Sequence, residues 1–250
     1  MQTTVTPIFG DGTPAAPAAR RAHVIAVTGG KGGVGKTSVS ANLAVSLALR
    51  GNRVCIFDAD TGLANINILL GLQPKNTLEQ FLNGGLSMQE LLVEGPRGVC
   101  VVPGASGIAD YADLDRPRQQ ALLNGFAQLE SQFDYLLIDT AAGIGKAVVE
   151  FVLAAEHAIL VVSPDPTSLT DSFALTRVLK RNGYAGRLHV VVNNSEGMDA
   201  AKKVYQRFAQ AVEKAELSEV EPFPVSRCVI VGRAAIIDAV SIPILPAVQK

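Results

Sequence analysis

The sequence predicts one α/β domain, built on a mostly parallel β-sheet with helices on its faces. Its 250 residues are enough for one domain with a substantial core and too few for two ordinary ones. Hydrophobic residues make up 48% of the chain and aromatic residues only 5%, which favours Val/Ile/Leu strands covered by Ala/Leu helices over an aromatic-rich sandwich. From His23 onward, short apolar runs alternate with segments of helical periodicity, as expected for parallel strands joined by helices.

The elements follow in chain order. Strands are predicted from apolar runs at 23–28, 53–57, 98–102, 135–138, 157–162 and 188–193. Helices are predicted from apolar residues spaced three and four apart at 36–49, 117–131, 146–154, 168–181 and 199–214. Gly51 and Gly183 stand just after two of these helices, where a glycine commonly ends a helix.

The first 22 residues differ from the rest of the chain. They are rich in Pro, Ala, Gly and Thr and show no sustained period. Such a segment cannot bury enough apolar surface to order itself. The predicted organisation is therefore a flexible leader at 1–22 followed by a single domain at 23–250.

Charge and hydropathy exclude several classes of protein. The 22 basic and 23 acidic residues nearly balance, so no global field draws the chain to DNA or to an anionic membrane. No run of 18 apolar residues occurs, and the start of the chain does not read as a secretion signal, so a cytoplasmic location is expected.

The cysteines and histidines are predicted to be structural. Cys55 and Cys100 lie in apolar strand-like runs far apart in the sequence, where cysteine usually packs as a small hydrophobe instead of binding metal or forming a disulfide. No metal-ligand or catalytic spacing joins the three histidines, which open predicted strands: His23, His157 and His189.

A complete phosphate-binding motif directly follows the first predicted strand. Residues 30–37 read Gly-Lys-Gly-Gly-Val-Gly-Lys-Thr, the eight-residue P-loop pattern, between a strand and a helix. Glycines let successive backbone N–H groups converge on phosphate oxygens, and the start of the helix adds its positive dipole end. Lys36 is expected to neutralise the β- and γ-phosphates, and the Thr37 hydroxyl to coordinate Mg²⁺. The residues predicted to bind the nucleotide here are Gly30, Lys31, Gly32, Gly33, Val34, Gly35, Lys36, Thr37 and Ser38.

Two further strands end in carboxylates at the edge of the sheet that the P-loop occupies. Asp139 follows the strand at 135–138 and is expected to hold Mg²⁺, usually through water. Asp58 and Asp60 follow the strand at 53–57, where one carboxylate could face the metal and the other the γ-phosphate and its attacking water. Ordinary turn chemistry also explains Asp and Gly at this point, so spacing alone leaves both interpretations open.

Together these motifs resemble the MinD/ParA class of deviant Walker A ATPases, which have a P-loop NTPase fold. The resemblance rests on GGKGGVGKT at 29–37, DADTGLANINILLGL at 58–72 and DTAAGI at 139–144. In that class an additional lysine in the P-loop reaches across a dimer to the partner's ATP, and Lys31 holds the matching position. The resemblance thus implies an ATP-dependent homodimer, with ATP and Mg²⁺ as cofactors. It also assigns the positioning of the attacking water to Asp60 and the Mg²⁺ environment to Asp58.

Within this class the chain is most similar to the flagellar-number regulators of the FlhG/FleN group. The similarity lies in LANINILLGL, in VVPGASG at 101–107 and in PDPTSLTDSFAL at 164–175. It implies control of flagellar number or placement through the polar GTPase FlhF, the transcription activator FleQ, or both. Slow, partner-stimulated ATP hydrolysis is expected. Asn193 or its neighbour Asn194 matches the position that reads the nucleotide base, and Asn193 is taken as the predicted contact. Residues 1–22 lack the helix motif through which some relatives activate FlhF.

A second hypothesis is a positioning ATPase of ParA or MinD type, acting on DNA, the division machinery or another polar cargo. Basic residues at 177–187 and 202–207 could form a patch, but they are equally typical of solvated helix faces, and direct DNA binding is not expected. Residues 241–250 contain two prolines and one lysine, unlike a basic amphipathic membrane helix. Contact with the inner membrane, or a polar position, is therefore expected to be peripheral at most and to depend on partners.

Overall fold

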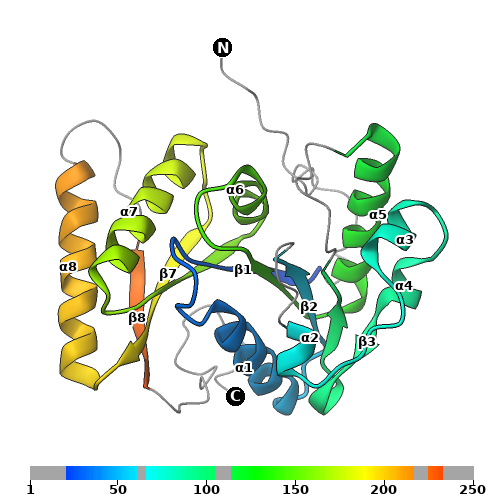
Figure 1. Cartoon of the computed structure of the whole chain (residues 1–250), viewed down its shortest axis with the longest axis horizontal. Coiled ribbons are helices and arrows are strands. Elements are labelled where there is room, and N and C mark those ends of the chain that lie inside the picture. The colour runs from blue at the N-terminus through cyan, green and yellow to red at the C-terminus, as the bar shows by residue number, and fades with distance from the viewer. Residues whose placement is uncertain (1–20, 61–65, 105–113, 217–224, 233–250) are drawn as a thin grey trace.

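The computed structural model describes residues 21–60, 66–104, 114–216 and 225–232, which form one eight-stranded sheet with helices on both faces (Figure 1). The strand order is β3-β4-β2-β5-β1-β6-β7-β8. Every neighbouring pair is parallel except β3 with β4. The predicted α/β fold with a mostly parallel sheet is thus confirmed.

The strands at the centre of the sheet are buried on both faces. All six residues of β2 and all six of β5 are buried, as the continuous apolar runs predicted. The strands are β1 (His23–Thr28), β2 (Val54–Ala59), β3 (Val93–Glu94), β4 (Cys100–Val102), β5 (Tyr135–Thr140), β6 (His157–Val162), β7 (Arg187–Ser195) and β8 (Val225–Gly232).

The five predicted helices are present, with ends shifted by two residues at most. They are α1 (Lys36–Leu49), α5 (Arg116–Gln132), α6 (Lys146–Leu153), α7 (Pro166–Arg181) and α8 (Met198–Glu216). Gly51 and Gly183 take the left-handed φ values of 83° and 78° just after α1 and α7, which confirms their role at helix ends. The sequence did not predict the short helices α2 (Ile66–Leu69), α3 (Leu78–Leu82), α4 (Met88–Leu91) and η1 (Pro96–Gly98), nor β3 and β8.

Each face of the sheet has its own apolar core. One core joins the sheet to α5, α6, α7 and α8, and includes the edge-to-face contact of Phe57 with Phe126 at 4.8 Å between ring centroids. The other lies under α1, whose Val39, Leu43 and Leu47 are almost fully buried. Figure 1 shows α1 on one side of the sheet and α6 and α7 on the other. Packing on both faces holds β1, β2 and β5 side by side, so that their carboxyl ends meet at one edge.

The described chain begins slightly before the first strand. Ala22 is buried, and Arg21 forms an ion pair with Glu130 on α5. The rest of the predicted leader lies outside the described residues. Among the helices that are described, none combines the length and the apolar character needed to cross a membrane.

Candidate nucleotide-binding site

The loop between β1 and α1 requires its glycines. Gly33 and Gly35 have φ values of 76° and 93°, which other residues rarely adopt. A Cβ on Gly30 would lie 2.2 Å from the carbonyl carbon of Asp171 on α7, and one on Gly35 would lie 2.3 Å from the side-chain nitrogen of Asn193 on β7. The predicted phosphate loop is therefore packed directly against α7 and β7, with no space for side chains at these two positions.

The start of α1 brings three polar side chains close to the Asp139 carboxylate at the end of β5. Ser40 donates its hydroxyl hydrogen to Asp139 Oδ1 at 2.9 Å, and the Thr37 hydroxyl is also hydrogen-bonded to Asp139. Lys36 is only 8% exposed, and burial lowers the pKa of its ammonium group, while Asp139 and Asp60 act in the opposite direction. The predicted members Lys36, Thr37 and Asp139 thus lie together.

Asp58 and Asp139 are direct neighbours across β2 and β5. They are register partners in the parallel pair, so their side chains project from the same face of the sheet. Burial raises the pKa of Asp139, and it raises the pKa of Asp58 to about 7. The negative charge of Asp60 adds to both increases, and the charge of Asp139 adds to the increase at Asp58. Among the described residues, nothing donates a hydrogen bond to the buried Asp58 Oδ2.

These features fit a divalent cation. Two buried carboxylates held side by side, one with an oxygen left unpaired, form an acceptor-rich site that a positive charge would stabilise. Mg²⁺ prefers oxygen ligands and keeps part of its water shell, so Thr37, Asp58 and Asp139 could hold it directly or through water. Within the described part of the chain no cluster of three or more His, Cys, Asp or Glu side chains could hold a metal by itself. Phosphate oxygens and water would therefore have to complete the coordination.

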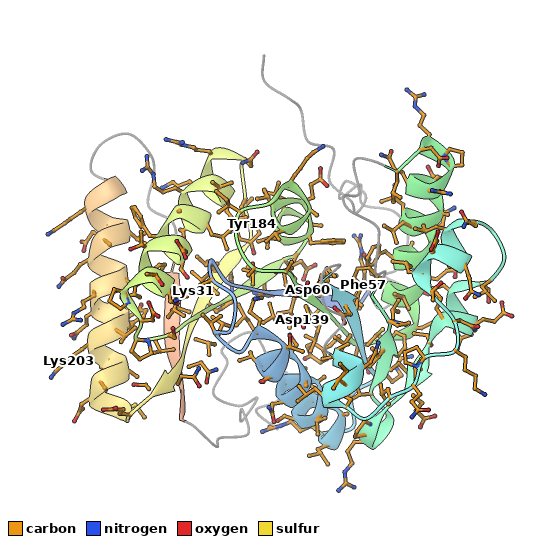
Figure 2. The ribbon with its side chains drawn as sticks, viewed as in Figure 1. Lys31, Phe57, Asp60, Asp139, Tyr184 and Lys203 are labelled. Carbon is orange, nitrogen blue, oxygen red and sulfur yellow. The ribbon has the colours of Figure 1, made fainter. Side chains whose placement is uncertain are left out.

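Asp60 lies just beyond β2, close to the other acidic groups. Its backbone N–H donates to Asp58 Oδ1 at 3.1 Å, and its carboxylate raises the pKa of Asp139. Figure 2 shows Asp60 and Asp139 toward the middle of the molecule, with Lys31 to one side. Residues 61–65, which follow Asp60 in the motif at 58–72, lie outside the described residues. In the segment that follows Asp139, the N–H of Gly143 donates to the Gly29 carbonyl at 3.0 Å. This hydrogen bond joins the segment after β5 to the phosphate loop.

Lys31 does not join the group around Asp139. Its ammonium group donates to Asp165 Oδ2 at 2.7 Å and to the Thr167 hydroxyl at 2.6 Å, and its side chain stays 37% exposed. Asp165 is the N-cap of α7, and its carboxylate accepts the Thr167 N–H at 2.8 Å. The hydrogen bond from Lys31 is the largest of the effects that lower the pKa of Asp165. Lys31 is thus held at the start of α7, away from Lys36 and Asp139.

Two predicted nucleotide contacts have other visible roles. Asn193 is 8% exposed and donates from Nδ2 to the Val34 carbonyl at 2.8 Å, which fixes the phosphate loop from β7. Base reading by Asn193 stays a prediction. Ser38 is exposed on the first turn of α1, where its backbone carbonyl accepts the side-chain amide of Asn42 at 2.7 Å.

Sequence reasoning missed Ser40 as part of the site, and missed Asp165 and Thr167 as partners of Lys31. Ser40 lies three residues after Thr37 and therefore on the same face of α1, so helical spacing could have found it. The contact of Lys31 with Asp165 joins residues 134 positions apart, and no local pattern signals it.

Fold and site together define a P-loop nucleotide-binding protein: a glycine-rich turn from strand to helix, a buried lysine and a strand-end carboxylate pair. The comparisons with known proteins agree. A family model described as an AAA domain matches residues 22–183. The chain is 44% identical over 192 residues to the antiactivator FleN of Pseudomonas aeruginosa, covering 77% of this chain and 69% of that protein. It is 35% identical over 202 residues to the flagellum site-determining protein YlxH of Helicobacter pylori, covering 79% of this chain and 66% of that one.

Among solved structures, the septum site-determining protein MinD of Pyrococcus horikoshii, complexed with Mg-ADP, matches with a TM-score of 0.58 and 30% identity over 73% of this chain and 77% of that one. The chain belongs to this AAA-domain family and is a P-loop ATPase of the MinD/ParA type, with flagellar regulators among its relatives. The resemblance found in the sequence is thereby confirmed. The match spans about two thirds of the length of FleN and YlxH.

Proposed function

We propose that this chain is a regulatory ATPase that binds Mg-ATP, dimerises in the ATP state and controls flagellar number or placement by binding a partner protein. The proposal is supported by the similarity to FleN, an antiactivator, and to YlxH, a flagellum site-determining protein. The observation that carries the dimer is the position of Lys31. A lysine inside the phosphate loop that is attached to α7 and partly exposed, instead of facing its own phosphates, is available to a second subunit.

The residues have separate tasks in this scheme. Lys36, buried beside Asp139, neutralises phosphate charge, and the backbone N–H groups of the glycine-rich turn bind phosphate oxygens. Thr37, Asp58 and Asp139 would hold the cation, and the Asp60 carboxylate would orient the attacking water. When bound, Mg-ATP supplies the phosphoanhydride bond whose hydrolysis ends the dimeric state. Turnover is slow until a partner completes the site, because phosphoryl transfer depends on positioning and charge stabilisation.

The solution mass of the purified chain tests the dimer, measured by light scattering with Mg-ADP and then with Mg-ATP. The wild type is expected to be a monomer with ADP and to form some dimer with ATP, and Asp60→Ala to accumulate the dimer because hydrolysis no longer separates it. Two matched loop variants serve as controls. Lys36→Ala should lose nucleotide binding, whereas Lys31→Ala should keep binding but fail to dimerise. A monomeric mass for Asp60→Ala with ATP would overturn the dimer switch.

The partner is tested with the trapped Asp60→Ala protein. Binding to a FlhF-like GTPase or a FleQ-like transcription activator, present with ATP and lost in Lys31→Ala, would support the flagellar role. ATP-dependent retention on random-sequence DNA that decreases steeply with salt would instead favour a positioning ATPase. The proposed location is the cytoplasm, with any polar or membrane-surface position reached through the partner.

A further inference from the structure

Two cysteines that lie far apart in the sequence are neighbours in the sheet. Cys55 on β2 and Cys100 on β4 are register partners in a parallel pair, and both are free thiols. Register partners project from the same face, and both side chains pack in the core on the α5 side of the sheet. The prediction that both cysteines pack as core hydrophobes is confirmed, and the 44 residues between them hide the fact that they are register partners.

The spacing of the strands suits a bond between the two sulfurs. Adjacent strands lie about 4.8 Å apart, and disulfides join residues whose Cα atoms are roughly 4.4–6.8 Å apart. The Cβ atoms of a disulfide are closer, near 3.8 Å on average, so closure requires β4 to move slightly toward β2. A disulfide under such strain is more easily reduced than a relaxed structural one.

The two thiols differ in access. Cys55 is fully buried, and its thiol makes a weak hydrogen bond to the Ile56 carbonyl at 3.9 Å. Cys100 is partly exposed, and its strand β4 has on its other side only the edge strand β3, which has two residues among those described. Burial raises the pKa of both thiols, and the Glu94 carboxylate, the register partner of Cys100 on β3, adds to the increase at Cys100. Cys100 is therefore the thiol that an external reagent reaches, and its reaction is slow at neutral pH.

We propose that Cys55 and Cys100 form a redox-sensitive dithiol that closes to an intramolecular disulfide by exchange with a small-molecule disulfide. The Cys100 thiolate attacks one sulfur of the small disulfide and releases one small thiol, which leaves a mixed disulfide on Cys100. The Cys55 thiolate then attacks the Cys100 sulfur and releases the second small thiol. In total, two protein thiols and one small disulfide become one protein disulfide and two small thiols, with the two protons carried by the released thiols.

Cys55 and Cys100 lie on strands that lead to the candidate nucleotide site. Asp58 is three residues beyond Cys55 on β2, and the chain leaving β4 packs against it. A Cβ on Gly104 would lie 2.9 Å from the Asp58 carbonyl oxygen and 3.2 Å from its carboxyl carbon. Because closure moves β4 relative to β2, it changes the contact between these two segments. The disulfide form is thus expected to bind Mg-ADP more weakly than the dithiol form.

The test uses the full chain with Cys228→Ser, which leaves only the two thiols in question. The folded protein is incubated with oxidised glutathione at mildly alkaline pH and studied by intact mass and by peptide mapping without reductant. The expected product has lost two hydrogen atoms, retains no glutathione and contains one linked peptide pair joining Cys55 to Cys100. A stable glutathione adduct as the end product, or no reaction while the urea-unfolded chain reacts, would overturn the proposal.

Two single variants in the same background test the order of the steps. Cys55→Ala should stop at a glutathione adduct on Cys100, whereas Cys100→Ala should not react, because Cys55 is buried. Equal adduct formation in both variants would contradict the asymmetry. Circular dichroism confirms that each variant is folded, and the linked peptide in the wild-type chain, with Cys228 present, provides a measurement without any core substitution.

Affinity for Mg-ADP then tests the link to the nucleotide site. It is measured before oxidation, after oxidation and after treatment with dithiothreitol. A loss of affinity that reduction restores supports the link, and an unchanged affinity contradicts it. The mass measurements do not depend on nucleotide binding, so failure of the proposed ATPase function would be distinguishable from failure of the disulfide.

Discussion

At the scale of single residues, the site holds buried carboxylates whose negative charge destabilises the folded protein until a cation binds. Asp58 is 2% exposed, and burial beside Asp139 raises its pKa from 3.8 to about 7. The folded state therefore binds a proton more readily than the unfolded state between these values, and the free energy of unfolding decreases as the pH rises through this range. Above pH 7 the charged carboxylate opposes folding in the absence of a cation.

Asp58→Asn is expected to stabilise the ligand-free protein. At pH 8 without Mg²⁺, the free energy of unfolding should increase by about 1–4 kcal/mol, since each pKa unit corresponds to about 1.4 kcal/mol. The gain should shrink toward pH 4, where the wild-type carboxyl is protonated. Urea unfolding at several pH values measures this. Asp139→Asn is the matched control and should gain less, because Asp139 accepts a hydrogen bond from Ser40. A gain that does not change with pH would contradict the argument.

At the scale of elements, the start of α7 combines two roles in one carboxylate. Asp165 caps the helix and also holds Lys31, whereas Asp115 caps α5 by accepting the Arg118 N–H at 3.0 Å and is not an ion-pair partner of Lys31. The two caps therefore allow a matched comparison.

Both Asp165→Ala and Asp115→Ala should lower the free energy of unfolding by about 1 kcal/mol, the usual effect of losing an N-cap. Only Asp165→Ala removes the ion pair that holds Lys31, and under the proposed function only this variant should change the ATP concentration at which half of the protein is dimeric. Chemical unfolding and light scattering measure the two effects. A shift in the dimer midpoint of similar size in both variants would show that helix stability, not the Lys31 contact, controls it.

The amino-terminal parts of β6 and β7 bring two histidines together, and one of them has a shifted pKa. His157 Nδ1 lies 3.2 Å from His189 Nε2, and burial followed by the charge of His189 lowers the pKa of His157 to about 4. The unfolded chain therefore binds the proton more readily, and stability is lost as the pH falls from about 6.5 toward 4. Glu156, Arg187 and His23 also act on His157, with Glu156 opposing the shift.

His157→Gln should flatten this part of the pH profile. Because the ring is partly exposed, the wild type is expected to lose only about 1–2 kcal/mol between pH 7 and pH 4.5 through this residue, less than the full shift would give. Unfolding by urea across this range measures the slope for both proteins. An unchanged slope in the variant would assign the loss to other groups.

The elements also show what the sequence could and could not predict. Long periodic segments such as α1 and buried strands such as β5 were predicted nearly to their ends. Their apolar residues are the ones that pack in the core, so the sequence pattern marks the element directly. β3, with two residues, is too short for any period to appear. Capping boxes start α3 and α4, formed by Thr77 with Gln80 and by Ser87 with Glu90. Their sequence pattern is a known helix-start signal, but neither helix was predicted from it.

The same contrast between local and long-range features explains which parts of the candidate site the sequence predicted. Lys36 and Thr37 follow from a contiguous motif, and the meeting of Asp58 with Asp139 follows from parallel strands ending at one edge. The contact of Lys31 with Asp165 and the register pairing of Cys55 with Cys100 depend on the strand order and on register, which local sequence does not encode.

At the scale of the whole molecule, the candidate site joins elements from both cores. The phosphate loop is fixed by α7 and β7, and its helix α1 packs on the opposite face of the sheet from α7. A ligand held by α1, β2 and β5 therefore stabilises the domain as a unit instead of one loop. Linkage gives the size: a ligand at about 100 times its dissociation constant adds about 2.7 kcal/mol.

Mg-ADP at this concentration should raise the melting temperature by roughly 5–11 °C, since 1 kcal/mol corresponds to about 2–4 °C in a domain of this size. Differential scanning calorimetry with and without Mg-ADP measures the shift. Lys36→Ala should show almost none, because its phosphate site lacks the buried charge. Lys31→Ala should shift as the wild type does, because Lys31 contacts α7 and not the Lys36–Asp139 group. If Lys31→Ala lost the shift as completely as Lys36→Ala, Lys31 would bind the nucleotide of its own subunit, and the argument that it is available to a second subunit would be wrong.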